Sequence, residues 1–270
     1  MKIGLAQINI KWEDKEFNKQ KCLKFIKEAK KESVDFVLFP EMTLTGFSMN
    51  VDKIKQDNSE IVDWFKEIAI KMNVYIGFGY VEVVDKKGEN KFSIVSPYGE
   101  QICKYTKIHP FSYGKESFYY RGGEKIVITD IKEFKVCPFI CYDLRFPEIF
   151  QIASKTAGLI TVSANWPQKR SEHWKTLLRA RAIENQCYVA GINTVGIVGD
   201  NLYSGDSMIV DPNGNVLVHE WEKEKLITYK IEIGEVKKTR RNFTLKNDRK
   251  ENLYIDLYEI NSKINHKGNL

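Results

Sequence analysis

Three reactive side chains each lie at the carboxyl end of a predicted buried strand. Glu41 directly follows VDFVLFP, Lys107 ends QICKYTK, and Cys141 ends FKVCPFIC. Ligand sites in open α/β sheets form where strands end, so we expect the three side chains to meet at one edge of a sheet. Their types supply a base, a cation and a nucleophile.

This combination suits the attack of a sulfur nucleophile on a carbonyl carbon. A cysteine attacks as the thiolate, but a free thiol titrates near pH ~8.5, so it needs a neighbouring base or cation. The Glu41 carboxylate can take the proton, and the Lys107 ammonium can stabilise the oxyanion that forms. Each residue alone also has a structural interpretation, because a lone cysteine is often a small buried hydrophobe. Spacing alone leaves both interpretations open. Neither Glu41 nor Lys107 is expected to belong to the core.

Three segments carry a specific family resemblance. FPEMTLTGFS (39–48), KYTKIHPF (104–111) and FICYDLRFPEIF (139–150) resemble the signature segments of the nitrilase, or carbon–nitrogen hydrolase, superfamily. The similarity extends from residue 1 to about residue 245. It implies an α/β fold, a four-layer α-β-β-α sandwich. It also implies that Glu41 is the general base, Lys107 stabilises the oxyanion and Cys141 is the nucleophile.

A narrower resemblance concerns the substrate. CYDLRFPE and segments 163–193 and 203–216 resemble the omega-amidases, which hydrolyse 2-oxoglutaramate and 2-oxosuccinamate. Tyr142-Asp143 follows the nucleophile, where true nitrilases typically have Trp-Glu, and this difference favours amide substrates over nitriles. Glu116 matches a second glutamate of many relatives, which would orient Lys107 or the substrate amide. The alternative for Glu116 is an ordinary loop carboxylate.

The resemblance implies a two-step reaction. Cys141 attacks the amide carbon while Lys107 and the backbone N–H of Tyr142 hold the oxyanion. Ammonia leaves, and water hydrolyses the thioester that remains. No metal and no organic cofactor has a role in this reaction. Other small carboxylated amides, such as deaminated glutathione or an N-carbamoyl amino acid, stay open as substrates. An alternative from another functional class is a family member without catalytic activity that serves as an interaction module.

Candidate substrate contacts follow from the charge of such a substrate. Arg145 and Arg170 are candidates for its remote carboxylate, because a guanidinium can bind a carboxylate through two hydrogen bonds. Arg145 has a structural alternative, an ion pair with Glu148. Three aromatic residues could form the pocket walls or simply belong to the core, namely Phe47, Tyr142 and Trp166.

The elements that must position these residues alternate between strands and helices, with hairpins in the middle of the chain. This order predicts mixed α/β layers. Apolar spacing predicts helices over 16–32 (with Phe17 on the apolar face), 59–73, 147–158 and 171–186. Strands are predicted over 2–10, 34–40, 74–84, 91–96, 101–107, 134–141, 159–164, 187–193, 207–218 and 226–233, with a turn at Asn213-Gly214. One domain is expected over 1–245, followed by a C-terminal extension, 246–270, that could pack at a subunit contact.

Composition excludes several classes of protein. The chain has 270 residues, 43% of them hydrophobic, and a net charge of +6, which excludes a disordered chain. We find no apolar run long enough to span a membrane and no signal-peptide pattern, so we expect a cytoplasmic protein. The five cysteines are dispersed, and Cys137 and Cys141 would lie about 13 Å apart on a strand, too far for a disulfide.

Partners beyond the small-molecule amide are limited. The four histidines show no metal-ligand spacing. Segment 237–250 carries seven basic residues, which could bind RNA or another anion. A solvated segment near a subunit contact is the favoured interpretation, because no aromatic stacking platform accompanies the charges. We therefore expect no nucleic acid and no membrane partner, and the family implies a homodimer or larger assembly.

Overall fold

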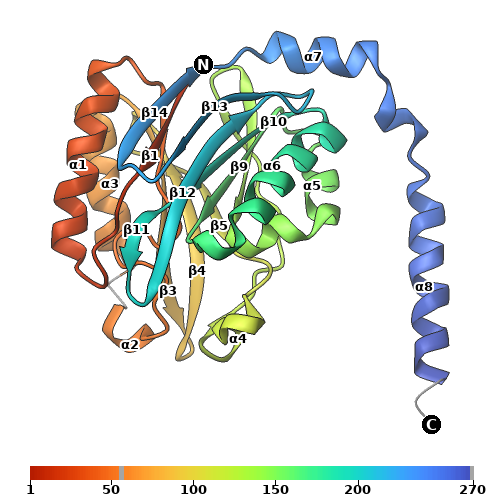
Figure 1. Cartoon of the computed structure of the whole chain (residues 1–270), viewed down its shortest axis with the longest axis horizontal. Coiled ribbons are helices and arrows are strands. Elements are labelled where there is room, and N and C mark those ends of the chain that lie inside the picture. The colour runs from red at the N-terminus through yellow and green to blue at the C-terminus, as the bar shows by residue number, and fades with distance from the viewer. Residues whose placement is uncertain (55–57, 268–270) are drawn as a thin grey trace.

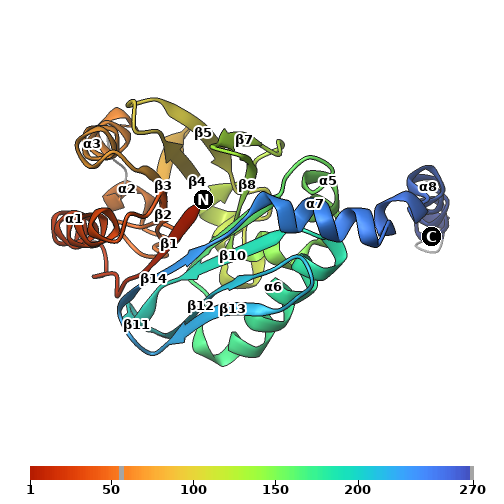
Figure 2. The same ribbon diagram turned by 90° about the horizontal axis from the view of Figure 1, so that it is seen from above.

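The computed structural model describes residues 1–54 and 58–267. Two mixed sheets of seven strands each lie face to face in the middle of the molecule (Figure 2). Helices α1 (Lys15–Lys31) and α3 (Asn58–Met72) cover the outer face of the first sheet, whereas α5 (Pro147–Ala153) and α6 (Ser171–Asn185) cover that of the second (Figure 1). The expected four-layer α-β-β-α sandwich is confirmed.

The first sheet has the order β14-β1-β2-β3-β4-β5, with β6 beside β4. Strands β1 to β3 run parallel, and β3 to β5 form the predicted antiparallel hairpins. Strand β2 is paired on both sides and buried on both faces, which explains its uninterrupted apolar sequence. The bounds of the strands are β1 (Lys2–Gln7), β2 (Phe36–Leu38), β3 (Tyr75–Val84), β4 (Lys87–Val95), β5 (Gln101–Thr106), β6 (Tyr120–Arg121) and β14 (Lys225–Lys230).

The second sheet has the order β11-β12-β10-β9-β8-β7, with β13 beside β12. Strands β8, β9 and β10 run parallel in its centre, and the connections between them are α5 and α6. The bounds of the strands are β7 (Thr129–Ile131), β8 (Phe134–Ile140), β9 (Leu159–Ala164), β10 (Tyr188–Asn193), β11 (Val195–Val198), β12 (Asn201–Val210) and β13 (Val216–Trp221). The Asn213-Gly214 turn between β12 and β13 is confirmed, with Gly214 at φ +86°.

Two hydrophobic cores hold the layers together. The larger core joins the facing sides of the two sheets, including Leu38 and Phe139, and continues beneath α5 and α6. The smaller core lies between the first sheet and helices α1 and α3, where the rings of Phe65 and Phe78 stack 3.9 Å apart. The two cores lie on opposite sides of the first sheet, so packing on both faces fixes its strands and their ends.

Several predicted boundaries need correction. Strand β1 ends at Gln7, short of residue 10. Phe17 is 44% exposed, and its ring lies beneath the ammonium groups of Lys11 and Lys21 and not in the core. Strand β12 begins at Asn201, not at 207, and β11 was not predicted at all. This edge hairpin exposes apolar side chains, so its sequence lacks a regular alternation of apolar and polar residues.

The predicted helix 147–158 ends early, at Ala153, and the basic C-terminal segment contacts its carboxyl end. Arg240 and Lys246 donate hydrogen bonds to the main-chain oxygen of Ser154, at 3.1 and 2.6 Å. Arg240 also reaches the oxygen of Gln186 just after α6. Cations are favourable at helix carboxyl ends, so at least these two basic residues fasten the C-terminal segment to α5 and α6.

The last residues form helices that the sequence did not predict. Helix α7 (Ile233–Asn242) runs outward, and α8 (Glu251–Lys267) projects beside the body (Figure 1). Four short 3₁₀ helices, η1 (Ser112–Gly114), η2 (Cys141–Arg145), η3 (Gln168–Arg170) and η4 (Leu245–Asp248), and two short α-helices, α2 (Val51–Ile54) and α4 (Glu116–Tyr119), complete the described chain. None of the described helices is long and apolar enough to cross a membrane.

Candidate functional site

Cys141 lies at a strained turn between β8 and η2. Its φ angle is +46°, a left-handed conformation that is rare for residues other than glycine. The carboxylate of Asp143 holds the turn, since its Oδ2 accepts a hydrogen bond from the N–H of Ile140 at 3.1 Å. Strain of this kind is concentrated at functional sites, where the surrounding structure maintains it.

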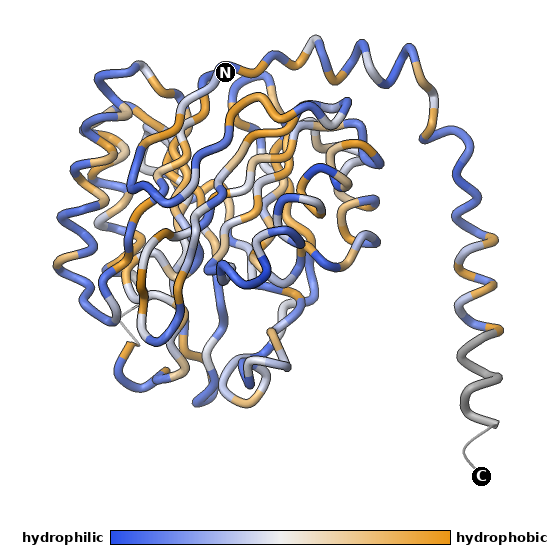
Figure 3. Tube along the Cα trace, in the orientation of Figure 1, coloured by the Kyte–Doolittle hydropathy of each residue, from blue (hydrophilic) through white to orange (hydrophobic). Residues whose placement is uncertain are grey.

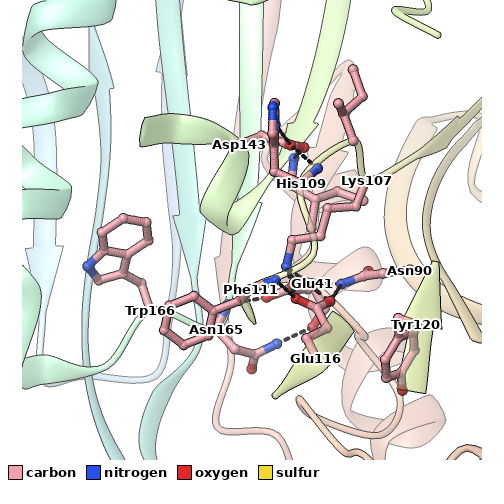
Figure 4. Close-up of polar contacts among 12 residues, drawn as sticks. Glu41, Asn90, Lys107, His109, Phe111, Glu116, Tyr120, Asp143, Asn165 and Trp166 are labelled. Carbon is pink, nitrogen blue, oxygen red and sulfur yellow. Dashed lines mark hydrogen bonds and ion pairs between the residues drawn. The ribbon is translucent and has the colours of Figure 1, made fainter. Parts of the chain in front are cut away.

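Asp143 also ties this turn to the segment that carries Lys107. Its Oδ2 accepts a hydrogen bond from the Tyr105 hydroxyl at 2.7 Å, and its Oδ1 accepts one from the N–H of His109 at 3.0 Å (Figure 4). Asp143 is fully buried and does not line the cavity described below. Its place after the nucleophile is therefore explained by a structural connection between the two segments.

Lys107 lies between two carboxylates (Figure 4). Its Nζ is 2.9 Å from Glu41 Oε1 and 2.9 Å from Glu116 Oε2. Asn90 donates to both carboxylates from Nδ2, at 2.7 and 3.1 Å. Exposure is 1% for Lys107 and 0% for Glu41 and Glu116, so the expectation that Glu41 and Lys107 lie outside the core is wrong. They are buried because each charge has an opposite charge and hydrogen-bond partners.

Tight packing fixes Glu41 from behind. Gly79 on β3 passes so close that a Cβ atom there would lie 2.9 Å from the Glu41 Cα and 2.4 Å from the Met42 nitrogen. Thr43 fastens the two segments, because its N–H donates to the Gly79 oxygen at 3.0 Å and its hydroxyl accepts from the Gly79 N–H at 2.9 Å. Glycine is thus required for this close approach.

The charges of this cluster shift each other's protonation. Burial acts to lower the pKa of Lys107, but Glu116 and Glu41 raise it well above its usual value, so the ammonium stays charged. Burial and the charge of Glu41 raise the pKa of Glu116, against the effect of Lys107. Burial and Glu41 also raise the pKa of the Cys141 thiol well above its usual value. The thiol is therefore protonated at neutral pH and needs a base to become a nucleophile.

Asn165 is a member of the site that the sequence did not reveal. It directly follows β9, and its backbone N–H donates to Glu41 Oε2 at 2.9 Å. Its side-chain Nδ2 donates to the Glu41 main-chain oxygen at 2.6 Å. The signal that identified Glu41, a polar residue directly after a buried strand, applies equally to Asn165. Asn165 thus orients the Glu41 carboxylate, whose charge acts on the Cys141 thiol.

A cavity of about 300 Å³ opens above Cys141. All the predicted pocket residues, Phe47, Tyr142, Arg145, Trp166 and Arg170, line it, as do Asn165 and Tyr203. Trp166 is only 3% exposed, and its indole N–H donates to the Arg170 main-chain oxygen at 2.8 Å. Glu41, Lys107 and Glu116 lie behind the cavity lining.

The two arginines of the cavity have no carboxylate partner among the described residues. The Arg145 guanidinium lies 4.8 Å from the Trp166 ring centroid, and its Nη2 contacts His173 Nδ1 at 3.2 Å. The Arg170 guanidinium lies 5.4 Å from the Phe111 ring centroid. The alternative pairing of Arg145 with Glu148 is absent, and Glu148 accepts a hydrogen bond from Tyr258. Burial and Arg170 lower the pKa of Arg145, so the cavity carries uncompensated positive charge.

Other reactive side chains in the described residues are accounted for. All five cysteines are free, and the separation of Cys137 from Cys141 as unbridged thiols is confirmed. His219 contacts Asp206 Oδ1 at 2.9 Å. In the described ranges, no group of three or more His, Cys, Asp and Glu side chains could hold a metal ion.

Comparisons with known proteins agree on one family. A family model described as carbon-nitrogen hydrolase matches residues 2–241. The chain is 34% identical over 256 residues to the 2-oxoglutaramate amidase of Bacillus subtilis, covering 93% of this chain and 98% of that protein. It is 36% identical over 184 residues to the omega-amidase YafV of Escherichia coli K12, covering 68% and 71%.

The fold comparison gives the same picture. A CN-hydrolase superfamily protein from Xanthomonas campestris, solved with an arsenic adduct in its active site, superposes with a TM-score of 0.87. The two chains are 31% identical, and the match covers 92% of this chain and 97% of the other.

Proposed function

Since this chain belongs to the carbon–nitrogen hydrolase family, we propose that it hydrolyses the amide of a small carboxylated substrate to a carboxylate and ammonia. The preferred substrates are 2-oxoglutaramate and 2-oxosuccinamate. The single observation that carries this proposal is the cavity itself. Cys141 lines it together with two guanidinium groups that have no carboxylate partner among the described residues, and the charge of the buried Glu41 acts on the thiol.

In the first half-reaction, Cys141 is the nucleophile and Glu41 the base. The thiol proton passes to Glu41 as the sulfur–carbon bond forms, and the carbonyl electron pair moves onto the oxygen. Lys107 and the backbone N–H of Tyr142 stabilise that oxyanion. Glu41 then protonates the nitrogen, the carbon–nitrogen bond breaks, and ammonia leaves a thioester on Cys141.

In the second half-reaction, water replaces ammonia. Glu41 takes a proton from water, hydroxide character develops at its oxygen, and the thioester carbon is attacked. The oxyanion collapses, the carbon–sulfur bond breaks, and the sulfur recovers the proton from Glu41. Glu116 orients Lys107 through its contacts at 2.9 and 3.2 Å. In both half-reactions, Glu41 transfers the protons, and Lys107 and the Tyr142 N–H stabilise the oxyanion. The proposed reaction therefore needs no cofactor.

The substrate preference rests on charge and on the relatives. Arg170 and Arg145 offer donors to a remote carboxylate, with Phe47 and Trp166 as walls beside them. A neutral amide would leave both guanidinium groups unpaired, which costs binding energy. The 2-oxoglutaramate amidase of Bacillus subtilis and the omega-amidase YafV support the 2-oxo acid amides as the first choice.

Assembly and location belong to the same proposal. We propose a catalytic domain over 1–245 and an extension over 246–270, of which the structure describes residues 246–267, that packs at the contact of a homodimer or larger oligomer. Helix α8 supports this, because its side chains Leu253, Tyr258 and Ile260 are 46%, 66% and 53% exposed. The five free cysteines fit a cytoplasmic location, where thiols stay reduced.

An ammonia-release assay over a panel of amides tests the proposed function. We expect kcat/KM for 2-oxoglutaramate and 2-oxosuccinamate to exceed that for an amide lacking the carboxylate by well over tenfold, and Arg170→Met to reduce that preference, mostly through KM. Equal turnover of neutral amides or nitriles would contradict the substrate assignment. A preference for deaminated glutathione or for N-carbamoyl amino acids would assign the protein to a different amidase activity of the same family. Absence of turnover with every amide would favour an idle interaction module.

A further inference from the structure

Tyr203 is a polar residue of the cavity to which the proposed reaction gives no role. It lies on β12 and lines the cavity together with Cys141 and Arg170, although the side chain is only 3% exposed. Its backbone is fixed, because Tyr203 pairs with Gly196 in the antiparallel ladder of β11 and β12. Burial, together with the neighbouring Cys141 and Glu41, raises the pKa of the phenol, so it remains a neutral donor across the physiological range.

The hydroxyl of Tyr203 differs from those of comparable buried tyrosines. Tyr105 donates to Asp143 at 2.7 Å, Tyr120 donates to the Ser48 oxygen at 2.6 Å, and Tyr80 accepts from Ser93 at 3.4 Å. In the described chain, the Tyr203 hydroxyl has no such protein partner. The hydroxyl oxygen is not enclosed by protein atoms, so this donor is available to a molecule in the cavity.

The position of Tyr203 limits which part of a substrate it can meet. Tyr203 lines the same cavity as Cys141 and Arg170. If the amide carbon lies at Cys141 and the carboxylate at Arg170, the phenol borders the space that holds the rest of the substrate. In a 2-oxo acid amide, the remaining polar group is the 2-oxo oxygen, which accepts hydrogen bonds and cannot donate them.

We infer that Tyr203 is a specificity-determining residue whose hydroxyl donates a hydrogen bond to the 2-oxo oxygen of the substrate. This inference rests on the proposed function and adds a recognition element to it. A 2-amino acid amide such as glutamine carries an ammonium group at that position. An ammonium cannot accept from the phenol, and it is repelled by Arg145 and Arg170. The same cavity thus selects an oxo group and rejects an amino group.

The test compares Tyr203→Phe with the natural protein on two substrates. These are 2-oxoglutaramate and glutaramate, the same chain without the 2-oxo oxygen. Because one hydrogen bond is lost and its acceptor left unpaired, kcat/KM for 2-oxoglutaramate should fall about 10-fold or more. The value for glutaramate should change by less than about twofold, since neither protein can make that bond. Tyr80→Phe removes a buried hydroxyl outside the cavity and should leave the ratio of the two values unchanged.

Each outcome has a distinct meaning. An equal fall on both substrates in Tyr203→Phe overturns the inference and leaves the amidase proposal intact. Hydrolysis of neither substrate by the natural protein overturns the proposed function, and the inference with it. If Tyr203→Phe does not fold, as judged by circular dichroism, Tyr203→Met provides the same comparison. Binding of 2-oxoglutarate and glutarate to Cys141→Ala, with and without Tyr203→Phe, gives a second readout in which only the 2-oxoglutarate affinity should fall.

Discussion

Lys107 illustrates how a buried charge is maintained for chemistry. Its ammonium lies between Glu41 and Glu116, 1% exposed, and both carboxylates are themselves fully buried. Removing one member of such a cluster leaves the others uncompensated, which costs far more than the net contribution of the intact pair. The residues of the site therefore contribute to stability as well as to activity.

We expect Lys107→Ala to lose at least about 10²-fold in kcat and ~3–5 kcal/mol of stability, because two carboxylates lose their cation. Glu41→Gln should lose a similar factor in kcat, with a smaller loss of stability, since Glu116 still faces Lys107. Initial rates and thermal unfolding by circular dichroism measure both effects.

Lys91 provides the matched control for Lys107. It is also buried and contacts two carboxylates, with Nζ 3.0 Å from Glu82 and 2.5 Å from Glu89, and neither of these belongs to the Glu41–Glu116 cluster. Lys91→Ala should therefore lose stability and keep kcat within about twofold in the folded fraction. Equal losses of kcat in Lys91→Ala and Lys107→Ala would mean that Lys107 acts only through stability.

The raised pKa of the Cys141 thiol gives a pH prediction. A thiol with an ordinary pKa reacts with iodoacetamide along a curve that titrates near pH ~8.5. Because burial and Glu41 raise the pKa of Cys141, its thiolate form is not populated at that pH. Labelling of Cys141 should therefore show no titration step between pH 7 and about 9. A sigmoid with its midpoint near ~8.5 in the natural protein would contradict this account.

At the scale of elements, the site residues that the sequence could predict lie mostly at the ends of strands. Glu41, Lys107 and Cys141 directly follow or end apolar runs, so their convergence could be inferred before any coordinates. Asp143 could not be assigned in this way, because its partners Tyr105 and His109 lie on another segment. Tyr203 could not be assigned either, because it lies within β12 and not at the end of a strand. The C-terminal helices escaped prediction because contacts with other elements, such as that of Arg240 with Ser154, fasten them.

Substitution of Asp143 tests the connection between the Cys141 turn and the segment that carries Lys107. Its carboxylate accepts hydrogen bonds from Ile140, His109 and Tyr105, and an asparagine there would turn an NH₂ group towards some of these donors. We expect Asp143→Asn to lose ~1–3 kcal/mol of stability and to lower kcat, because the Cys141 turn shifts relative to Lys107.

Asp206→Asn is the control for this substitution. Asp206 is also buried, but it accepts hydrogen bonds from Ser171 and Ser204 near the start of α6, beside Arg170. Its replacement should act mainly on KM for the carboxylated substrate. A rise in KM without a fall in kcat for Asp143→Asn would show that Asp143 does not align the nucleophile with Lys107.

At the scale of the whole molecule, α8 is the element with the least support from its own chain. Leu253 and Ile260 lie two helical turns apart and are 46% and 53% exposed. Figure 3 shows hydrophobic residues recurring along the described part of this helix. A single helix of this length is marginally stable in water, so an apolar stripe of this kind needs a second surface. A second copy of the chain is the partner that the proposed assembly provides.

We expect the full chain to be a homodimer or larger by light scattering after gel filtration. Replacing Leu253 and Ile260 together by Gln should shift it towards the monomer, because both apolar contacts are lost. Tyr98→Gln changes a side chain that is 80% exposed on another part of the molecule and should leave the mass unchanged. A monomeric natural protein, or an assembly that tolerates the double substitution, would remove α8 from the subunit contact.

The central claim is a covalent thioester on Cys141, and acid-quenched mass spectrometry tests it most directly. The protein is mixed with 2-oxoglutaramate, quenched in acid during turnover, digested, and each cysteine peptide is weighed. We predict an adduct equal to substrate minus ammonia on the peptide that contains Cys141, and neither adduct nor ammonia release in Cys141→Ala. Ammonia release by Cys141→Ala at the natural rate, or an adduct on a different cysteine, would contradict the account.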